Sequence, residues 1–169
     1  MTGGAIVLIG PMGAGKTSIG KRVAKALGTS FYDSDAAVVR EHGAIELIFE
    51  RNGEQQFRTW ERTAVTDGLA RGGVVSLGGG AVLDPDTQAD LAAHRVVLLT
   101  VDDRTIASRI RGTKRPLLHG DDALVRWRAV YAQRREIYER LASVTFDTSS
   151  GPLQEIVSAI VEWAERTEE

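Results

Sequence analysis

Residues 10–17 read Gly10-Pro11-Met12-Gly13-Ala14-Gly15-Lys16-Thr17, and they match the phosphate-binding loop pattern G-x-x-x-x-G-K-[ST] at every required position. An apolar run of strand length, residues 5–9, comes directly before this motif. After it, apolar residues recur at helical spacing until Gly28, which is a helix stop signal. An ordinary glycine-rich turn needs neither the lysine-threonine pair nor this context. The sequence therefore predicts a strand, a phosphate-binding loop and a helix.

Each part of this motif has a task in binding a nucleoside triphosphate. Glycines let backbone N–H groups approach a phosphate with no Cβ atom in the way, and the helix N-terminus adds a favourable dipole. Lys16 is expected to reach the β- and γ-phosphates, and the Thr17 hydroxyl to bind the accompanying Mg²⁺. We therefore expect ATP as co-substrate, Lys16 as a catalytic cation, and a nucleotide-binding set of Gly10, Met12, Gly13, Ala14, Gly15, Lys16, Thr17 and Ser18.

The composition excludes several classes of protein. Of the 169 residues, 43% are hydrophobic and 26% are charged, which is typical of a soluble globular domain. A net charge of −2 provides no general attraction for nucleic acid, and the absence of cysteine excludes disulfides and thiolate zinc sites. No window approaches a membrane span, and no targeting pattern precedes the motif. We expect one domain over residues 1–169, cytoplasmic and monomeric, with no nucleic-acid or membrane partner.

Short apolar segments alternate with helical patterns along the rest of the chain. The further strand candidates are residues 30–32, 74–77, 96–101 and 144–146. Their near-continuous apolar character is typical of strands covered on both faces, as in a parallel sheet. The expected helices are one from Asp84-Pro85 to near Ala93, 104–111 after the cap Asp102, one after Gly53, 121–141, and a last one over 153–164. This alternation predicts a three-layer α/β fold with about five parallel strands and helices on both faces.

Asp33 and Asp35 come directly after the second strand candidate. Because ligands collect beyond the carboxyl ends of parallel strands, these carboxylates are expected to face the phosphate-binding loop. One can order Mg²⁺ and its waters, while the other accepts the proton of an acceptor hydroxyl group during phosphoryl transfer. Aspartate is also a preferred helix N-cap, and a helix begins near this point, so the residues alone leave both interpretations open.

The third strand candidate runs straight into Gly78, Gly79 and Gly80. Three adjacent glycines place consecutive backbone donors at the same edge of the sheet. A flexible connection to the next helix is the alternative, but a plain connection rarely needs three glycines and their entropic cost. We therefore interpret this segment as part of a ligand site.

Two arginines bear on the nature of the acceptor. Arg134 falls on the apolar stripe of the helix expected over residues 121–141, where a charged residue is disfavoured. Its head either reaches the rim of the core or meets an anion. Arg58 lies on an earlier helix, where surface pairing with Glu54 and Glu61 explains it better when it is taken alone.

Residues 112–120 read Gly112-Thr113-Lys114-Arg115-Pro116-Leu117-Leu118-His119-Gly120 between two helical patterns. Basic residues bracketed by glycines are typical of a mobile lid that closes on ATP. Arg115 is expected to bind the nucleotide and to neutralise charge on the transferring phosphoryl group. A solvated loop is the alternative, and it would also be mobile.

Taken in this order and spacing, the motifs resemble the shikimate kinase family of P-loop kinases, which are related to the nucleoside-monophosphate kinases. The resemblance covers almost the whole chain. It rests on residues 10–17, the Asp-Ser-Asp of 33–35, Phe57-Arg58 with Glu61, the Leu-Gly-Gly-Gly of 77–80, the Arg-Pro-Leu-Leu of 115–118, and Arg134 with Tyr138. It implies a sheet order of 2-3-1-4-5 and ATP-dependent phosphorylation of the 3-hydroxyl group of shikimate.

The resemblance also implies roles for the residues of the acceptor site. Asp35 would bind and activate the hydroxyl group. Arg58 and Arg134 would hold the substrate carboxylate, and Gly79 and Gly80 would contact the substrate. A carboxylate base beside two arginine forks suits a small hydroxylated carboxylic acid.

On the nucleotide side, the resemblance implies that Asp33 assists Mg²⁺ through water and that Arg109 and Pro152 approach the adenine. Two alternatives remain open. A gluconate-type sugar-acid kinase also needs a carboxylate clamp and a base for the hydroxyl group, although the three glycines and the Arg-Pro-Leu-Leu segment favour shikimate. A nucleotide-dependent binding module without a phosphoryl acceptor is the other, and the candidate base Asp35 argues against it.

Overall fold

Five short strands form one parallel sheet in the computed structural model, which describes residues 3–109 and 122–168. The strands are β1 (Ile6–Ile9), β2 (Phe31–Asp33), β3 (Val74–Ser76), β4 (Arg95–Thr100) and β5 (Val144–Asp147). Their order in the sheet is β2-β3-β1-β4-β5, and every neighbouring pair is parallel. The predicted strands and their predicted order are therefore confirmed, with ends that differ by one residue.

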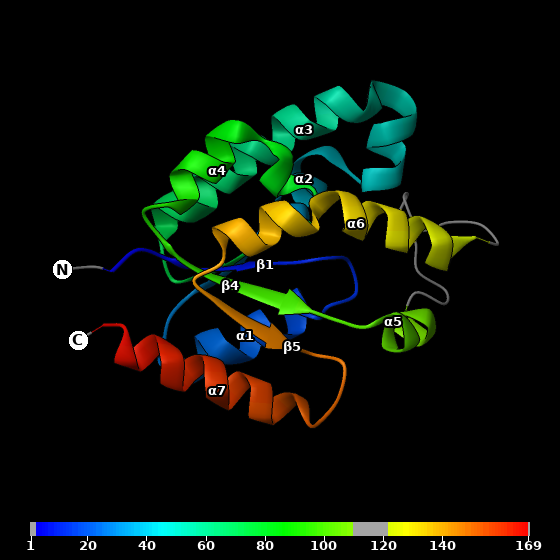
Figure 1. Ribbon diagram of the computed structural model, residues 1–169. Helices are drawn as coiled ribbons and strands as arrows, with labels where there is room; N and C mark the ends of the chain where they lie inside the picture. The colour runs from blue at the N-terminus through cyan, green and yellow to red at the C-terminus, as the bar shows by residue number, and fades with distance from the viewer. Residues whose placement is uncertain (1–2, 110–121, 169) are drawn as a thin grey trace.

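Helices cover both faces of this sheet, as the sequence predicts (Figure 1). The first helix, α1 (Lys16–Leu27), packs beside the last, α7 (Leu153–Arg166), on one face. The other face carries α3 (Ile45–Arg71), α4 (Pro85–Leu91) and α6 (Ala123–Leu141). Covering both faces is required because every residue of β1 is buried, so neither side of the central strand can face water.

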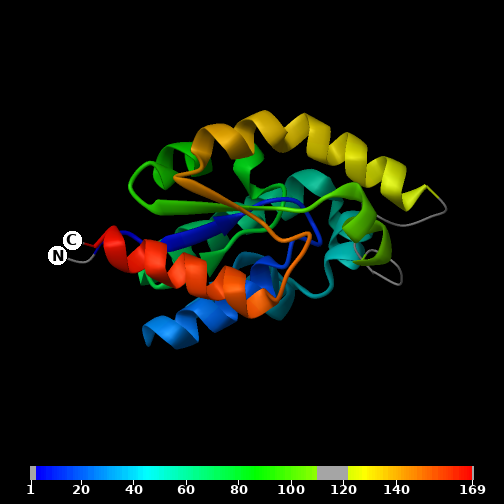
Figure 2. The same ribbon diagram turned by 60° about the horizontal axis from the view of Figure 1, so that its bottom comes forward.

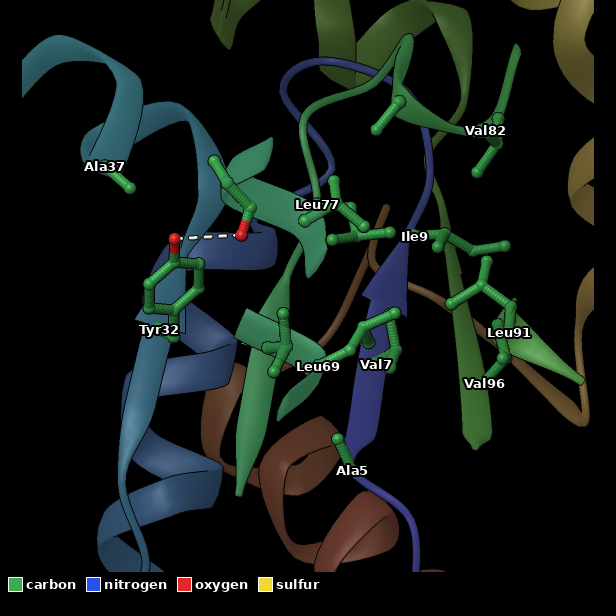
Figure 3. Close-up of a cluster of buried hydrophobic side chains, with 14 of the residues drawn as sticks. Ala5, Val7, Ile9, Tyr32, Ala37, Leu69, Leu77, Val82, Leu91 and Val96 are labelled. Carbon is green, nitrogen blue, oxygen red and sulfur yellow. Dashed lines mark hydrogen bonds between the residues drawn. The ribbon is translucent and has the colours of Figure 1, made fainter. Parts of the chain in front are cut away.

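The side chains of β1 alternate between two hydrophobic clusters. Val7 and Ile9 point toward α3 and α4, where they join the cluster drawn in Figure 3. Ile6 and Leu8 point the other way, into the cluster shared with α1 and α7. Burying a side chain of this size contributes about 1.5–3 kcal/mol. The central strand therefore anchors both layers and fixes the position of the loop that follows it.

A break divides α3 into two helical segments. Gly53 has φ 85° and ψ 166°, which are not helical, so the helix expected to follow this glycine does begin there. The second segment is fixed to the sheet by Tyr32 of β2, whose hydroxyl donates to the carbonyl oxygen of Ala64 at 2.9 Å (Figure 3). The same segment carries Arg58, so its position relative to the sheet also places that side chain.

Three predicted helix boundaries have the expected chemistry. Gly28 ends α1 in the left-handed conformation with φ 66°. Asp84 caps α4 by accepting from the backbone N–H groups of the first turn, although the helix ends at Leu91, short of the predicted Ala93. Asp102 accepts from the N–H of Thr105 at 2.8 Å at the start of α5 (Asp103–Arg109).

The carboxyl ends of the strands meet at one edge of the sheet, opposite the edge where both chain ends lie (Figures 1 and 2). The phosphate-binding loop follows β1. The helix α2 (Ser34–His42) follows β2, and three glycines lead from β3 to the short 3₁₀ helix η1 (Ala81–Leu83). The predicted lid at 112–120, including Arg115, lies outside the described residues. Among the residues described, no helix is long and apolar enough to cross a membrane.

Candidate active site

The phosphate-binding loop is held tightly between β1 and α1. Gly10 has φ 145°, and a Cβ atom there would lie 2.2 Å from the carbonyl oxygen of Leu99 in the neighbouring strand. Gly13 and Gly15 also have positive φ values, 83° and 91°. Only glycine adopts such conformations without strain, so the pattern that identifies the loop also reports its backbone shape. Lys16 then begins α1 directly after the last glycine.

Lys16 lies over the loop rather than in solvent. Its side chain is 9% exposed, and its ammonium group donates to the carbonyl oxygens of Gly10 at 2.7 Å and Pro11 at 3.0 Å. These contacts keep the positive charge within the loop, where the phosphates of a nucleotide are expected to bind. The position agrees with the role expected from the sequence.

Thr17 and Asp33 bring two oxygen atoms together beside the loop. The Thr17 hydroxyl donates to Oδ2 of Asp33 at 2.6 Å, while Oδ1 of Asp33 accepts from the N–H of Ala36 at 3.0 Å. The side chain therefore performs the helix-capping role and also faces the phosphate-binding loop, so the two interpretations of this residue are compatible. A hydroxyl and a carboxylate oxygen are ligands that suit Mg²⁺.

Few protein ligands are needed at such a site. No group of three or more His, Cys, Asp or Glu side chains that could hold a metal occurs among residues 3–109 and 122–168. Magnesium in kinases is usually bound by one or two carboxylates together with phosphate oxygens and water. The donors present therefore fit Mg²⁺ that arrives with a nucleotide rather than a dedicated all-protein metal site.

Asp35 lies against the segment of three glycines. A Cβ atom on Gly78 would come within 2.4 Å of Oδ1 of Asp35, so the carboxylate packs directly on the backbone. Ser34, which is fully buried, accepts from the N–H of Gly78 at 3.0 Å and fixes the approach. The glycines are needed here because other segments come close to them, which the sequence interpretation in terms of exposed donors did not include.

Arg58 forms both of the ion pairs that the sequence suggested, yet it also lines a cavity. Its guanidinium lies 2.9 Å from Glu61 and 3.3 Å from Glu54. A Cβ atom on Gly80 would lie 2.4 Å from Nη1 of Arg58, so this glycine makes room for the guanidinium. The arginine therefore reaches the glycine segment that Asp35 also contacts.

Glu61 is the buried member of this pair, at 3% exposure. Burial raises its pKa from 4.5 to about 7; the attraction of Arg58 opposes the rise, and the negative charge of Asp35 adds to it. For Arg58, burial alone would lower the pKa, but the two glutamates outweigh burial and raise it. Burial thus has the larger effect on the pKa of Glu61, and ion pairing has the larger effect on the pKa of Arg58.

Arg134, on α6, lines the same cavity as Arg58. It is 4% exposed, and its buried Nε has no hydrogen-bond partner within the described parts of the chain. Its Nη1 would lie 3.4 Å from a Cβ atom on Gly79. A buried cation with an unsatisfied donor is costly unless it meets an anion. The core-rim interpretation of this residue is therefore the weaker one.

Tyr138 holds the glycine segment of residues 78–80 beside Arg134. Its hydroxyl donates to the carbonyl oxygen of Gly79 at 2.5 Å. Burial raises the pKa of Tyr138 to about 12, against the opposing effects of the positive charge of Arg134 and its hydrogen bond to the phenol oxygen. The tyrosine is thus a neutral donor at any physiological pH, and it connects α6 to the glycine segment.

Two adjoining cavities connect these groups. The larger, of about 700 Å³, is lined by the phosphate-binding loop, Thr17, Asp33 and Asp35. Its size lies within the range of small-molecule sites. The smaller, of about 50 Å³, is lined by both arginines together with Asp35, Glu61, Gly79 and Gly80. Because Asp35 lines both cavities, it lies between the phosphate-binding loop and the two cations.

Of the two residues expected near the adenine, Arg109 contacts the phosphate-binding loop and Pro152 lies in the connection before α7. Arg109 donates to the carbonyl oxygen of Gly13 at 2.7 Å and to that of Thr148, after β5, at 2.8 Å. Pro152 is exposed and forms the N-cap position of α7 in the same connection. The structure therefore connects the end of α5 with both the phosphate-binding loop and the segment that precedes α7.

Three further residues of this site were not among the predicted site residues. Ser34 and Tyr138 hold the glycine segment, and Glu61 holds Arg58. A serine between two aspartates resembles any helix start, and a tyrosine on an apolar stripe resembles core packing. Glu61 did stand at helical spacing from Arg58, so a local signal for that pair existed. Its burial depends on tertiary packing, which the spacing does not report.

Comparison with known proteins identifies the family. The family model described as "Shikimate kinase" matches residues 12–165. A shikimate kinase of Thermobifida fusca is 44% identical over 157 residues, which are 91% of this chain and 91% of that protein.

Solved structures agree with this match. "Shikimate kinase from Acinetobacter baumannii in complex with shikimate" superposes with a TM-score of 0.91 at 33% identity, covering 97% of this chain and 94% of that one. A gluconokinase from Sinorhizobium meliloti 1021 covers 99% of both chains at a TM-score of 0.60 and 20% identity. At that identity the likeness shows a shared fold only.

Proposed function

The chain belongs to the shikimate kinase family, and we propose that it transfers the γ-phosphoryl group of ATP to the 3-hydroxyl group of shikimate, giving shikimate 3-phosphate and ADP. The observation that carries this proposal is the position of Asp35. It lies between a phosphate-binding loop and a cavity lined by two arginines. That arrangement can orient an acceptor hydroxyl toward a nucleotide while its carboxylate is held at the other end.

The nucleotide is the electrophile of the reaction. Lys16 has three N–H donors and lies within the loop, so it can contact the β- and γ-phosphates as negative charge develops on them. Thr17 and Asp33 would hold Mg²⁺, directly or through water, and the ion would neutralise phosphate charge when bound. Arg109 and Pro152 would border the adenine, and Arg115 would act from the segment outside the described residues.

The acceptor is the nucleophile. Asp35 accepts the proton of the 3-hydroxyl group while the oxygen of that hydroxyl group forms a bond to the γ-phosphorus. At the same time, the bond from the γ-phosphorus to the β,γ-bridging oxygen breaks. ADP carries away the electron pair. The glycine segment permits this geometry, since a side chain on Gly78 would displace the carboxylate. Gly79 and Gly80 would border the bound acid.

The carboxylate of the acceptor is held by the two cations. Arg134 contributes a buried guanidinium group whose Nε has no hydrogen-bond partner among the described residues. Arg58 contributes a second guanidinium group, which forms ion pairs with Glu61 and Glu54. Guanidinium groups bind carboxylates through paired hydrogen bonds, which fix orientation as well as affinity. The two arginines therefore fix the position of the carboxylate relative to Asp35, and the site selects an acceptor whose hydroxyl group lies at the matching distance from its carboxylate.

An acceptor panel tests the proposal. ADP release is measured with MgATP alone, and then with shikimate, gluconate or a nucleoside monophosphate added. We expect release to depend on shikimate and to stay near the background rate with the other acceptors. A higher specificity constant for gluconate would replace the proposal with a sugar-acid kinase. Tight ATP binding without turnover of any acceptor would favour a nucleotide-dependent binding module.

The role of the arginines is tested with an analogue whose carboxylate is reduced to an alcohol. Loss of a hydrogen bond to a charged group costs about 1.5–3 kcal/mol, so Arg58→Ala or Arg134→Ala should raise the KM for shikimate about 10- to 150-fold. The analogue should be a poor substrate of the wild-type enzyme and lose much less on mutation. Equal losses for both substrates, with a lower Tm, would show that the arginines act on folding and not on recognition.

A further inference from the structure

Trp127, near the start of α6, makes a contact that the proposed mechanism does not use. Its indole N–H donates to the carbonyl oxygen of Met12 in the phosphate-binding loop at 2.8 Å, across 115 residues of sequence. The side chain is 2% exposed. A buried indole N–H usually finds a partner, but the partner here is a backbone atom of the nucleotide site.

The geometry of the peptide bond gives this contact a consequence. In a planar trans peptide the carbonyl and the N–H point in opposite directions. A donor that holds the carbonyl of Met12 therefore also sets the direction of the N–H of Gly13, which belongs to the same peptide unit. Gly13 lines the large cavity. Its N–H is thus turned away from the indole, to the side of the loop where the phosphates are expected.

This peptide needs an external restraint. Gly13 has φ 83° and no side chain, so the flanking backbone does little to prevent the peptide from rotating. The indole ring itself is held, because it stacks on Tyr131 with a centroid distance of 5.2 Å. A fixed ring on α6 can therefore transmit its orientation to the loop.

The other side chains that donate to the carbonyls of this loop, Lys16 and Arg109, differ from Trp127 in one respect. Lys16 donates hydrogen bonds to the carbonyl oxygens of Gly10 and Pro11, and Arg109 donates one to the carbonyl oxygen of Gly13. Both are cations with expected contacts to the nucleotide, so ligand binding can draw them away from the loop. The neutral indole has no such competing partner and can hold its carbonyl in both states.

We propose that Trp127 is a positioning residue that orients the Met12–Gly13 peptide so that the N–H of Gly13 faces the phosphates of the bound nucleotide. The inference rests on the proposed kinase function, because that function supplies the nucleotide, but its test concerns nucleotide binding alone. It predicts a selective loss of nucleotide affinity when the indole N–H is removed.

The test compares Trp127→Phe with Trp163→Phe, a matched control on α7 that removes the same atoms from a half-buried tryptophan distant from the loop. Loss of one neutral hydrogen bond corresponds to a change of about 2- to 12-fold. We expect the Kd for MgADP, measured by calorimetry without acceptor, and the KM for ATP to rise by that factor in Trp127→Phe. The KM for shikimate should change less than 2-fold, and the control should match the wild type.

A second measurement is made on the wild-type protein alone. In ¹⁵N-labelled wild-type protein, with the indole signal assigned by triple-resonance spectra, the Trp127 indole N–H should keep a hydrogen-bonded chemical shift when MgADP is added, with its exchange with water slowed. Unchanged Kd and KM values in Trp127→Phe would overturn the proposal. So would equal rises in both KM values with a lower Tm, since these indicate packing alone. MgADP affinity that responds as expected in a protein that does not phosphorylate shikimate would overturn only the kinase function.

Discussion

At the scale of single residues, two carboxylates separated by one residue, Asp33 and Asp35, have separate surroundings. Asp33 uses one oxygen to cap α2 and the other to accept from Thr17, whereas Asp35 lies on Gly78 between the two cavities. Because β2 ends at Asp33 and α2 begins at Ser34, the side chains of Asp33 and Asp35 point to different neighbours. The proposed division between metal support and proton acceptance follows from these positions.

Asparagine substitutions test this division, because asparagine keeps the size and removes the charge. Asp35→Asn should lower kcat by roughly 10²- to 10⁴-fold, since the proton acceptor is lost, with little change in ATP affinity. Asp33→Asn should keep the helix cap, for which asparagine is equally suited, but raise the Mg²⁺ concentration needed for half-maximal activity. Rates are measured over a range of Mg²⁺ concentrations. The division is wrong if the two variants respond alike.

Glu61 predicts a pH dependence of stability. Its pKa is raised in the folded protein from 4.5 to about 7, so the folded state holds the proton more tightly than the unfolded state. The stability linked to this group is therefore fully present below about pH 4.5 and is lost as the pH rises through about 7. At 1.36 kcal/mol per pKa unit, the loss is on the order of 3 kcal/mol.

Glu61→Gln isolates this effect, because glutamine can still accept from Arg58 but does not titrate. Unfolding free energies from urea titrations of both proteins should diverge between pH 4.5 and 7, with the wild type losing stability relative to the variant as pH rises. A difference that is constant over this window would mean that Glu61 is ionised throughout. Its ion pair with Arg58 would then outweigh its burial.

At the scale of elements, the glycine segment after β3 is where three side chains of the site come close to the backbone. The Cβ positions of Gly78, Gly79 and Gly80 lie nearest, respectively, to Asp35, Arg134 and Arg58. None of the three glycines has a positive φ. Their smallness, rather than their conformational freedom, is therefore what the site uses.

Alanine substitutions should consequently give two different kinetic defects. Gly78→Ala places a methyl group 2.4 Å from Oδ1 of Asp35 and should lower kcat. Gly80→Ala places one 2.4 Å from Nη1 of Arg58 and should raise the KM for shikimate. Gly3→Ala, which meets only Arg95 at 3.8 Å, is the neutral control. Steady-state kinetics with shikimate varied measure both constants. Identical defects in the two variants would point to a general distortion of the segment.

The elements were predictable where the signal is local. Apolar runs predicted the strands within one residue, Gly28 marked a helix end, and Asp84 and Gly53 marked helix starts. The spacing of three and four residues that placed Arg134 on an apolar stripe made it a candidate anion ligand, and the family resemblance then implied its role at the substrate carboxylate. These patterns depend on backbone geometry and on burial of one face, which short segments report directly.

The contacts between elements were not predictable from such patterns. Taken alone, the spacing of Arg58 favoured surface pairing, and both pairs exist, yet the same guanidinium also reaches the cavity. Whether Glu61 is buried, or Tyr138 meets a backbone carbonyl, depends on how α3 and α6 pack over the glycine segment. The lid and Arg115 remain predictions, because they lie outside the described residues.

At the scale of the whole molecule, the expectation of one domain over residues 1–169 remains a prediction with a direct test. Tryptophans lie on α3, α6 and α7, so they report on both faces of the sheet. Urea unfolding followed by tryptophan fluorescence and by far-ultraviolet circular dichroism should give one transition with the same midpoint. Two separated midpoints would indicate independently unfolding parts. Sedimentation of the folded protein without urea tests the expected monomer.

As a whole, this molecule is expected to join the γ-phosphoryl group of ATP to the 3-hydroxyl group of shikimate. The most direct measurement is the structure of the product formed from MgATP and shikimate, determined by proton–phosphorus correlation spectroscopy alongside ADP release. We predict one phosphate ester per ADP, with the phosphorus coupled to the proton on carbon 3. A phosphate on another hydroxyl group, or ADP formed while shikimate stays unmodified, would contradict the account.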